Sequence, residues 1–516
     1  MRVSKWDREI LRLAVPSIVT NVTVPLLGLI DLAIVGHIGN ETMIGAIAVG
    51  SMIFNVMYWL MGFLRMGTSG MAAQEYGAHQ NDATASISFG SGVGGRALRL
   101  ALMIAVGMLL LQVPLRWLSL WLMGPSAEVA SYVREYYNIC IWGAPAMLSL
   151  YVMTVWYIGM QDTRTPMVVS ITQNIINIVV SLVLVFGFKM QIEGVALGTL
   201  IAQWSGAAMA WGNLPRPLRG RGGPSGLSFF NKQTVLRKAL SFFFPRYRSI
   251  IEPARLCRLR SKKGARTDRF RNEMEKESGK AERGWGVSPI EEAGSISPIE
   301  GVEGCSPIEG VGGGSPFFQT NFDLFLRTIC LVAVNLFFTS AGARQGDMLL
   351  SVNTLLMTFF TLFSYVMDGF ANAGEALCGK YDGNSSQQSL QAVIRHLFRW
   401  GWLMVVLFTA VYALGGRGFV GLLTDEVRVV DATMKYLPWA LLIPVAGMAA
   451  FVYDGIFIGL LKTRGMLVAS AVATVAFFGL FYALFPLWGN HALWLALIVY
   501  LVLRGLVQHV YLVKSE

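Results

Sequence analysis

Long apolar stretches, separated by short polar segments, run along most of this chain. Residues 102–111, 178–188 and 492–503 are almost wholly apolar and lie inside longer windows of the same character. A helix needs about 20 predominantly apolar residues to cross the hydrocarbon core of a bilayer. The pattern therefore predicts membrane-spanning helices rather than the amphipathic helices of a water-soluble protein.

Hydropathy windows of about 19 residues predict an all-α polytopic membrane protein with about twelve transmembrane helices. The expected spans lie near residues 13–36, 44–64, 95–115, 134–157, 166–187, 193–213, 325–343, 348–371, 396–415, 436–460, 465–486 and 491–511.

Composition agrees with this pattern, because 54% of the 516 residues are hydrophobic and only 14% are charged. A soluble surface needs more charge than that. The formal net charge is +11, and much of the excess lies in one polar insert and in short segments between spans. This placement indicates membrane orientation rather than binding to nucleic acid.

Basic residues set the expected orientation. Arg2, Lys5, Arg8 and Arg12 precede the first span, and alternate loops carry further arginine and lysine. Because cytoplasmic loops are enriched in these residues, we expect both termini to face the cytoplasm. The localisation we expect is the bacterial inner membrane, crossed many times.

A polar segment divides the spans six and six. It contains a basic block at 255–271, followed by Gly, Ser and Pro with Ser-Pro-Ile-Glu recurring from Ser288, Ser297 and Ser306. Such a segment cannot bury a core. We expect an N-terminal lobe at 1–213, a disordered cytoplasmic loop at 214–320 and a C-terminal lobe at 321–516. The loop is either a linker or a regulatory tether.

The two halves carry traces of a duplication. A shift of 307 residues aligns three glycine positions: Gly39 with Gly346, Gly62 with Gly369, and Gly67 with Gly374. Two repeated bundles with a site between them are a common transporter design, because one bundle can rock against the other. The repeat predicts two pseudo-symmetric lobes of six helices each.

Asp31 is the strongest candidate for chemistry. It lies in the middle of the first span with no basic neighbour one helical turn away, and its counterpart in the repeat is Phe338. A carboxylate there costs about 2.5 to 3.5 kcal/mol, so it is expected to face a polar cavity. It could take up a proton or hold Na⁺, whereas the alternative is a hydrogen bond that only packs helices.

Other polar and proline residues surround that prediction. Pro16 and Pro25 could let the first helix bend and gate a cavity, or could be ordinary membrane prolines. On the fifth span, Asn174 and Asn177 share a helix face, and their amides could bridge Asp31, coordinate a cation or join helices.

Further residues are candidates for a central cavity. Asp368, Glu375 and Asp454 lie near span ends, where capping or contact with water is the simpler interpretation. Arg327 is expected to extend to the membrane interface. Soft and aromatic side chains suit promiscuous apolar ligands, although each could also be packing: the candidates are Met57, Met61, Met153, Trp156, Met357 and Tyr365.

Enzymatic signatures are absent from the sequence. It has no Walker loop, no HExxH motif and no nucleophile elbow, and its five histidines are scattered. We therefore expect a protein that is not an enzyme, has no cofactor or bound metal other than Na⁺ at Asp31, and draws its energy from an H⁺ or Na⁺ gradient.

Four segments resemble the multidrug and toxic compound extrusion (MATE) family, especially its DNA-damage-inducible, DinF-like branch. They are the first span at 16–36 with its aspartate, residues 67–77, the run Gly-Met-Gln-Asp-Thr-Arg-Thr-Pro at 159–166, and residues 368–377. The resemblance implies twelve helices in two lobes, alternating access, and multidrug efflux by antiport against H⁺ or Na⁺.

The resemblance also implies roles for single residues. Asp31 corresponds to the proton or cation site of the family, and Asn177 to its fifth-span asparagine. A second family acid, four residues after that asparagine, is replaced here by Ser181. This departure makes Asp31 the dominant titrating group.

Three other functions are alternatives to drug export. A flippase of lipid-linked precursors would need a cationic cavity, a non-transporting scaffold would act through the insert, and an intramembrane enzyme would need a paired nucleophile and base.

The expected partners are organic cations, amphiphilic drugs, bile salts and membrane lipids, with no nucleic acid, and we expect a monomer.

Overall fold

The computed structural model describes residues 4–36, 41–81, 89–90, 92–214, 316–424 and 426–515. Within them, the side chains of 24–36 and of residues 41, 42, 44, 81, 316, 347 and 515 are not described. Most of the predicted polar segment at 214–320 lies outside the described residues. What the sequence predicts for it stays a prediction.

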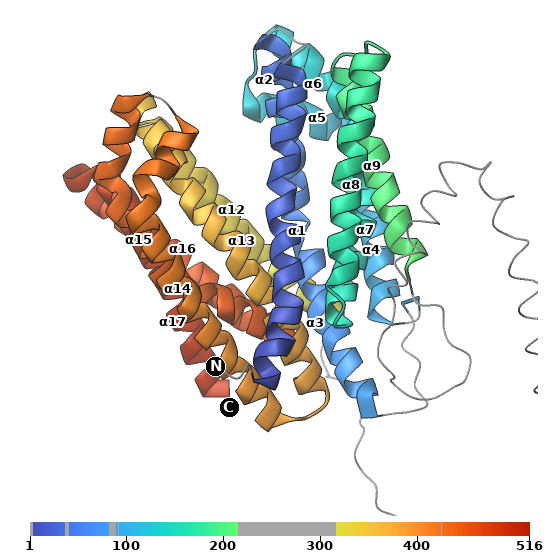
Figure 1. Cartoon of the computed structure of the whole chain (residues 1–516), viewed down its shortest axis with the longest axis vertical. Coiled ribbons are helices and arrows are strands. Elements are labelled where there is room, and N and C mark those ends of the chain that lie inside the picture. The colour runs from blue at the N-terminus through green and yellow to red at the C-terminus, as the bar shows by residue number, and fades with distance from the viewer. Residues whose placement is uncertain are drawn as a thin grey trace, which may run out of the picture. The chain divides into compact units, whose positions relative to one another are not determined.

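Every regular element among the described residues of the N-terminal half is a helix (Figure 1). It contains α1 (Lys5–Gly36), α2 (Glu41–Leu60), α3 (Gly62–Ala78), η1 (His79–Asn81), α4 (Val93–Leu110), α5 (Gln112–Met123), α6 (Ala127–Cys140), η2 (Ile141–Gly143), α7 (Ala144–Gly159), α8 (Arg164–Leu182), η3 (Val183–Gly187) and α9 (Ile192–Gly212). Local sequence sets some of these ends: Gly124 stops α5 in a left-handed conformation, and the hydroxyl of Ser126 caps α6.

The C-terminal half is built from longer helices. These are α12 (Pro316–Ala343), α13 (Asp347–Gly383), α14 (Gln387–Leu423), α15 (Val427–Gly459), α16 (Thr463–Trp488) and α17 (Asn490–Ser515). Each of the twelve predicted spans falls on one or more of the described helices, and the described residues contain no strand. The prediction of an all-α polytopic protein is confirmed.

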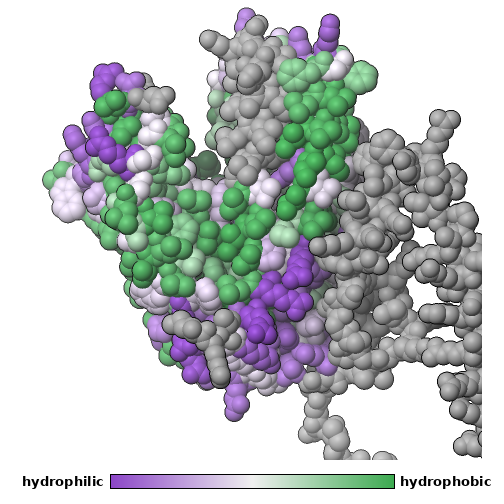
Figure 2. All heavy atoms as spheres, in the orientation of Figure 1, coloured by the Kyte–Doolittle hydropathy of each residue, from purple (hydrophilic) through white to green (hydrophobic). Residues whose placement is uncertain are grey.

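Hydropathy agrees with a membrane protein. Ten helical segments within the described residues are long and apolar enough to cross a membrane, and α1 and α9 are not among them. On the face drawn in Figure 2, hydrophobic side chains cover the flanks of the helices, and hydrophilic ones gather at the end where both termini lie. The chain is therefore a multi-pass membrane protein.

Helix α1 is continuous through both of its prolines. Pro16 is buried, and its carbonyl oxygen accepts a hydrogen bond from the Thr20 hydroxyl at 3.0 Å. Pro25 lies in the part of α1 whose side chains are not described. The helix runs unbroken from Lys5 to Gly36, so gating by a bend at these positions stays a prediction.

Buried side chains form a hydrophobic core in each half of the described chain. The first part of α1 belongs to the C-terminal core, because Ile10, Leu13 and Ala14 pack among residues of α12 to α17. In return, Phe317 at the start of α12 packs in the N-terminal core. Each half therefore packs the first turns of one of its helices into the core of the other half.

Glycines bring the halves close together where α3 meets α13 and α15. A Cβ atom added at Gly70 would collide with the carbonyl oxygen of Ile458, and one at Gly383 with that of Gln74. The Gln74 amide donates across this boundary to the Asp382 carboxylate at 2.7 Å and to the Gly459 carbonyl at 3.1 Å. We call these contacts the glycine seam.

The N-terminal turn of α1 is tied to α13 and α14. One Asp7 oxygen accepts hydrogen bonds from His396 at 2.7 Å and Trp400 at 3.1 Å. The Tyr381 hydroxyl donates to Glu9 at 2.8 Å. Burial raises the pKa of Asp7, but the hydrogen bonds from His396, Ser4 and Trp400 outweigh it and lower the pKa to about 2.

Candidate functional site

A buried polar cluster lies between α8 and α9 in the N-terminal half. Asn177 and Ser181 on α8 are both 0% exposed, and the Asn177 amide donates to the Thr199 hydroxyl on α9 at 3.1 Å. The remaining Asn177 oxygen and the Ser181 hydroxyl oxygen have no hydrogen-bond partner among the described residues. Buried polar atoms normally have partners, so these two oxygens mark a place where a proton donor or a cation can bind.

Helix α1 runs beside α8 in the same direction. The Thr163 hydroxyl donates to the Arg12 carbonyl at 3.4 Å, and the Asn174 amide donates to the Thr23 carbonyl at 3.1 Å. Both contacts join residues 151 positions apart, so the two helices keep one register over this length.

Continued past its last contact, this register would bring residue 31 level with the polar cluster. Residue 31 lies eight positions beyond Thr23 on α1, a rise of about 12 Å, and the same offset of 151 brings it level with residue 182, next to Ser181. The side chain of Asp31 is not described. That Asp31 acts together with Asn177 and Ser181 stays a prediction.

The two predicted asparagines thus contact different helices. Asn174 joins α8 to α1, whereas Asn177 joins α8 to α9. Thr199 was not among the predicted residues. A single threonine in an apolar span carries no sequence signal, because its hydroxyl usually bonds within its own helix.

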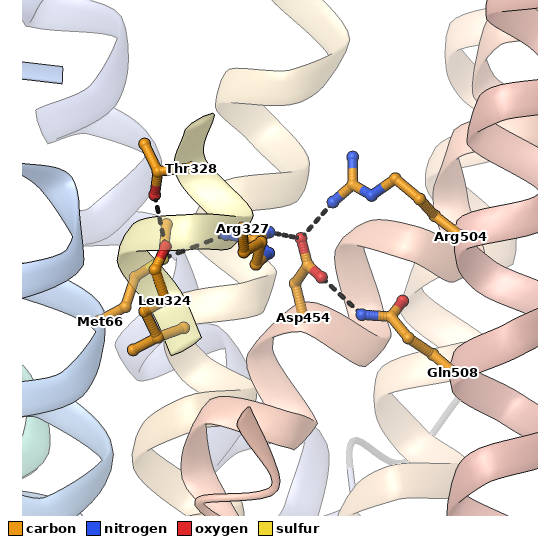
Figure 3. A network of polar contacts seen from close by, with 7 residues as sticks. All are labelled: Met66, Leu324, Arg327, Thr328, Asp454, Arg504 and Gln508. Atoms are coloured by element: carbon orange, nitrogen blue, oxygen red, sulfur yellow. Dashed lines mark hydrogen bonds and ion pairs between the residues drawn. The ribbon is translucent and has the colours of Figure 1, made fainter. Parts of the chain in front are cut away.

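A second polar network lies in the C-terminal half (Figure 3). Asp454 on α15 accepts hydrogen bonds from Arg327 on α12, from Arg504 on α17 at 2.6 Å, and from Gln508 on α17 at 2.7 Å. Arg327 also reaches the sulfur of Met66 on α3 at 3.2 Å. We call Arg327, Asp454, Arg504 and Gln508 the arginine network.

The arginine network corrects two expectations. Asp454 is buried and bonded to three side chains rather than capping a helix or contacting water. Arg327 does not extend to the membrane interface, since it is 2% exposed and paired with Asp454. Charge pairing replaces solvation here, because a buried guanidinium needs a carboxylate partner. Arg504 and Gln508 were not predicted; two polar positions one turn apart in an apolar helix are the sequence signal that could have pointed to them.

The predicted cavity residues occupy several environments. Met153 and Trp156 are buried in the N-terminal core, and Met57 and Met61 pack against it. Met357 packs against the C-terminal core.

Three further candidates lie on α13. The backbone carbonyl of Tyr365 accepts a hydrogen bond from Asn21 on α1 at 3.2 Å. Glu375 is 5% exposed, and Asp368 is half-buried. The described residues contain no cluster of three or more His, Cys, Asp or Glu that could hold a metal ion.

Known proteins resemble this chain in sequence over most of its length. The family model described as MatE matches residues 16–183 and 324–482. The chain is 32% identical over 504 residues to DNA damage-inducible protein F of Escherichia coli, covering 97% of this chain and 90% of that protein. It is 26% identical over 213 residues to the probable multidrug resistance protein NorM of Thermotoga maritima, covering 40% of this chain and 44% of that protein.

Solved structures share the fold. A MATE structure in the bent conformation matches with a TM-score of 0.70 at 14% identity, covering 98% of this chain and 95% of that one. The Vibrio cholerae MATE transporter VcmN in its bent form also gives 0.70 at 14% identity, covering 99% and 97%. The chain therefore belongs to the multidrug and toxic compound extrusion family and is a membrane transporter with the two-lobed MATE fold.

Proposed function

We propose that this transporter is a secondary antiporter, which exports bulky organic compounds across the bacterial inner membrane in exchange for inward H⁺ or Na⁺. Asp31 is the site of the coupling ion. The substrates are organic cations and amphiphilic drugs, and both termini face the cytoplasm. Two relatives, a probable multidrug resistance protein and a multidrug export protein, support this substrate class.

One observation carries the proposal. The register of α1 and α8 supports it: continued eight residues past Thr23, the same offset makes residue 31 level with two buried oxygens that lack partners among the described residues, those of Asn177 and Ser181. A protonated Asp31 could donate to one of them. An ionised Asp31 and the same oxygens offer the hard ligands that a small cation prefers.

Exchange follows from the different affinities of two conformations. Ion binding at Asp31 favours the state that releases substrate outward, and loss of the ion toward the cytoplasm favours the state that accepts substrate there. Each ligand shifts the equilibrium only by its difference in affinity between the two states. The hydrogen bond from Asn174 to the α1 backbone connects the cluster to the helix that carries Asp31.

The direct test uses purified full-length protein in proteoliposomes. A proton gradient and a sodium gradient are imposed separately, and uptake of a small panel of cationic dyes is followed. We expect accumulation against the dye gradient under one of the two ion gradients and collapse of that accumulation when the gradient is dissipated. Equal dye movement with and without either gradient would contradict the proposal.

A further inference from the structure

A basic hollow opens on the first turns of α1, at the end of the molecule where hydrophilic side chains gather (Figure 2). It has a volume of about 420 Å³, and the described residues that line it are Lys5, Arg8, Glu9 and Arg12. These positions are three or four residues apart, so they lie on one face of the helix. Three basic side chains and one acidic side chain give the lining an excess of positive charge.

This positive charge has no acidic partner in the described part of the chain. The ion pairs found there all use other side chains than Lys5, Arg8 and Arg12. Glu9, the acid of the lining, accepts a hydrogen bond from the Tyr381 hydroxyl on α13 at 2.8 Å. Asp7 is turned to α14, where His396 and Trp400 donate to it. An anion that enters the basic hollow therefore meets an excess of positive charge.

Aromatic rings place the basic hollow at the depth of the lipid headgroups. The rings of Trp6 on α1 and Tyr381 on α13 meet edge to face, with their centres 5.5 Å apart. Lys5 Nζ lies 5.2 Å from the centre of the Trp6 ring, and Lys380 Nζ lies 4.9 Å from that of Tyr381. Tryptophan and tyrosine are enriched at the interface between membrane and water, where lysine also places its charge.

The exposed face of α1 changes from basic to apolar as the helix continues. Lys5, Arg8 and Arg12 are exposed, while other faces of the helix pack against α13 and α8. The next exposed positions on the basic face are Val15, Val19 and Val22, which are 51%, 39% and 36% exposed. We call these three residues the valine face. A basic end followed by an apolar strip matches the two parts of a phospholipid, its charged headgroup and its acyl chains.

We propose that the basic hollow binds the headgroup of an anionic phospholipid, with its phosphate paired to Arg8 and Arg12 and an acyl chain along the valine face. Guanidinium groups suit this ligand, because they bind phosphate oxygens through pairs of parallel hydrogen bonds. Basic pockets between transmembrane helices hold anionic headgroups in the same way. A lipid bound here stabilises the start of α1 in its contacts with α13 and α14. The site is separate from the coupling-ion site proposed at Asp31.

The test measures the unfolding temperature of the purified full-length protein in detergent micelles with added phospholipid. We expect phosphatidylglycerol to raise it more than the same amount of phosphatidylcholine, whose choline neutralises the phosphate. Arg8→Gln and Arg12→Gln should each raise the half-saturating concentration of phosphatidylglycerol about fivefold. The control Arg428→Gln, at a side chain 83% exposed and paired with Glu426, should respond like the wild type. Equal responses to both lipids, or unchanged responses of both variants, would overturn the proposal.

Two further measurements identify the source of the phosphate. Inorganic phosphate should not reproduce the rise, because it cannot use the valine face, and Val19→Gln should weaken the response to phosphatidylglycerol. A full response to inorganic phosphate would show that the basic hollow takes a soluble anion instead.

The wild-type protein alone provides a test that needs no substitution. Added salt should reduce the response to phosphatidylglycerol, because salt screens charges that are exposed to water. A response that does not depend on salt would contradict a charged headgroup site. None of these readouts needs transport, so they judge the basic hollow even if the dye experiment fails.

Discussion

At the residue scale, each buried charge depends on its partners. Asp454 accepts hydrogen bonds from two arginines and a glutamine, and Asn at this position would leave both guanidinium groups buried without a counter-charge. Breaking a buried pair costs about 3 to 5 kcal/mol. We therefore expect Asp454→Asn to lower the free energy of unfolding in detergent by that amount.

The matched control is a pair at the surface. A guanidinium nitrogen of Arg417 lies 3.0 Å from a carboxylate oxygen of Asp431, and the two side chains are 70% and 55% exposed. Exposed pairs contribute at most about 1 kcal/mol, because water and salt screen them. Asp431→Asn should therefore change stability little, and equal effects of the two substitutions would contradict the importance of the arginine network.

Sequence located some site residues and missed others for a physical reason. Asn177, which is buried and polar, was identifiable because a polar group in hydrocarbon is costly wherever it points. Asp31 was predicted on the same ground, and its role stays a prediction. The pairing of Arg327 with Asp454 was not identifiable, because it depends on the packing of α12 against α15 and α17 rather than on local sequence. Thr199 was missed because a hydroxyl alone gives no signal.

At the element scale, the glycine seam fixes how closely the halves approach. A methyl group at Gly70 would collide with the α15 backbone, which cannot move aside alone. Overpacking of this kind costs about 1 to 3 kcal/mol. We expect Gly70→Ala to lower the unfolding temperature in detergent.

Gly107 on α4 provides the control for that substitution. A Cβ atom there meets nothing within 4 Å, and alanine favours a helix by about 1 kcal/mol over glycine. Gly107→Ala should leave the unfolding temperature unchanged or raise it. A loss of stability that is equal at both positions would mean that the seam does not limit the packing.

The hydrogen bonds that Asp7 of α1 accepts from α14 predict that the stability of the folded protein depends on pH. The pKa of Asp7 is lowered from 3.8 to about 2, so its ionised form stabilises the folded protein. This contribution is fully present above about pH 4 and is lost as the pH falls through about 2. The difference in unfolding temperature between wild type and Asp7→Asn should therefore shrink over that interval. A constant difference would show that Asp7 does not titrate in this way.

The hydropathy pattern predicted where the helices lie but not how far two of them extend. The span expected at 348–371 continues as α13 to Gly383, and the one at 44–64 breaks at Met61 and continues as α3 to Ala78. Both extensions are less apolar than the spans themselves. They are helical because they pack against each other at the glycine seam, which is tertiary information.

At the scale of the whole molecule, the internal repeat was enough to predict two six-helix halves. It could not show which helices join them, because α1 and α12 exchange ends between the two cores. Charge uptake at Asp31 drives the proposed exchange, in which one half moves against the other.

The most direct measurement compares wild type and Asp31→Asn in proteoliposomes for two activities: dye accumulation driven by the coupling ion, and dye-for-dye exchange without a gradient. We predict that the variant loses accumulation and retains exchange, because its binding surfaces remain but its ion site does not. Full gradient-driven accumulation by Asp31→Asn would contradict the account.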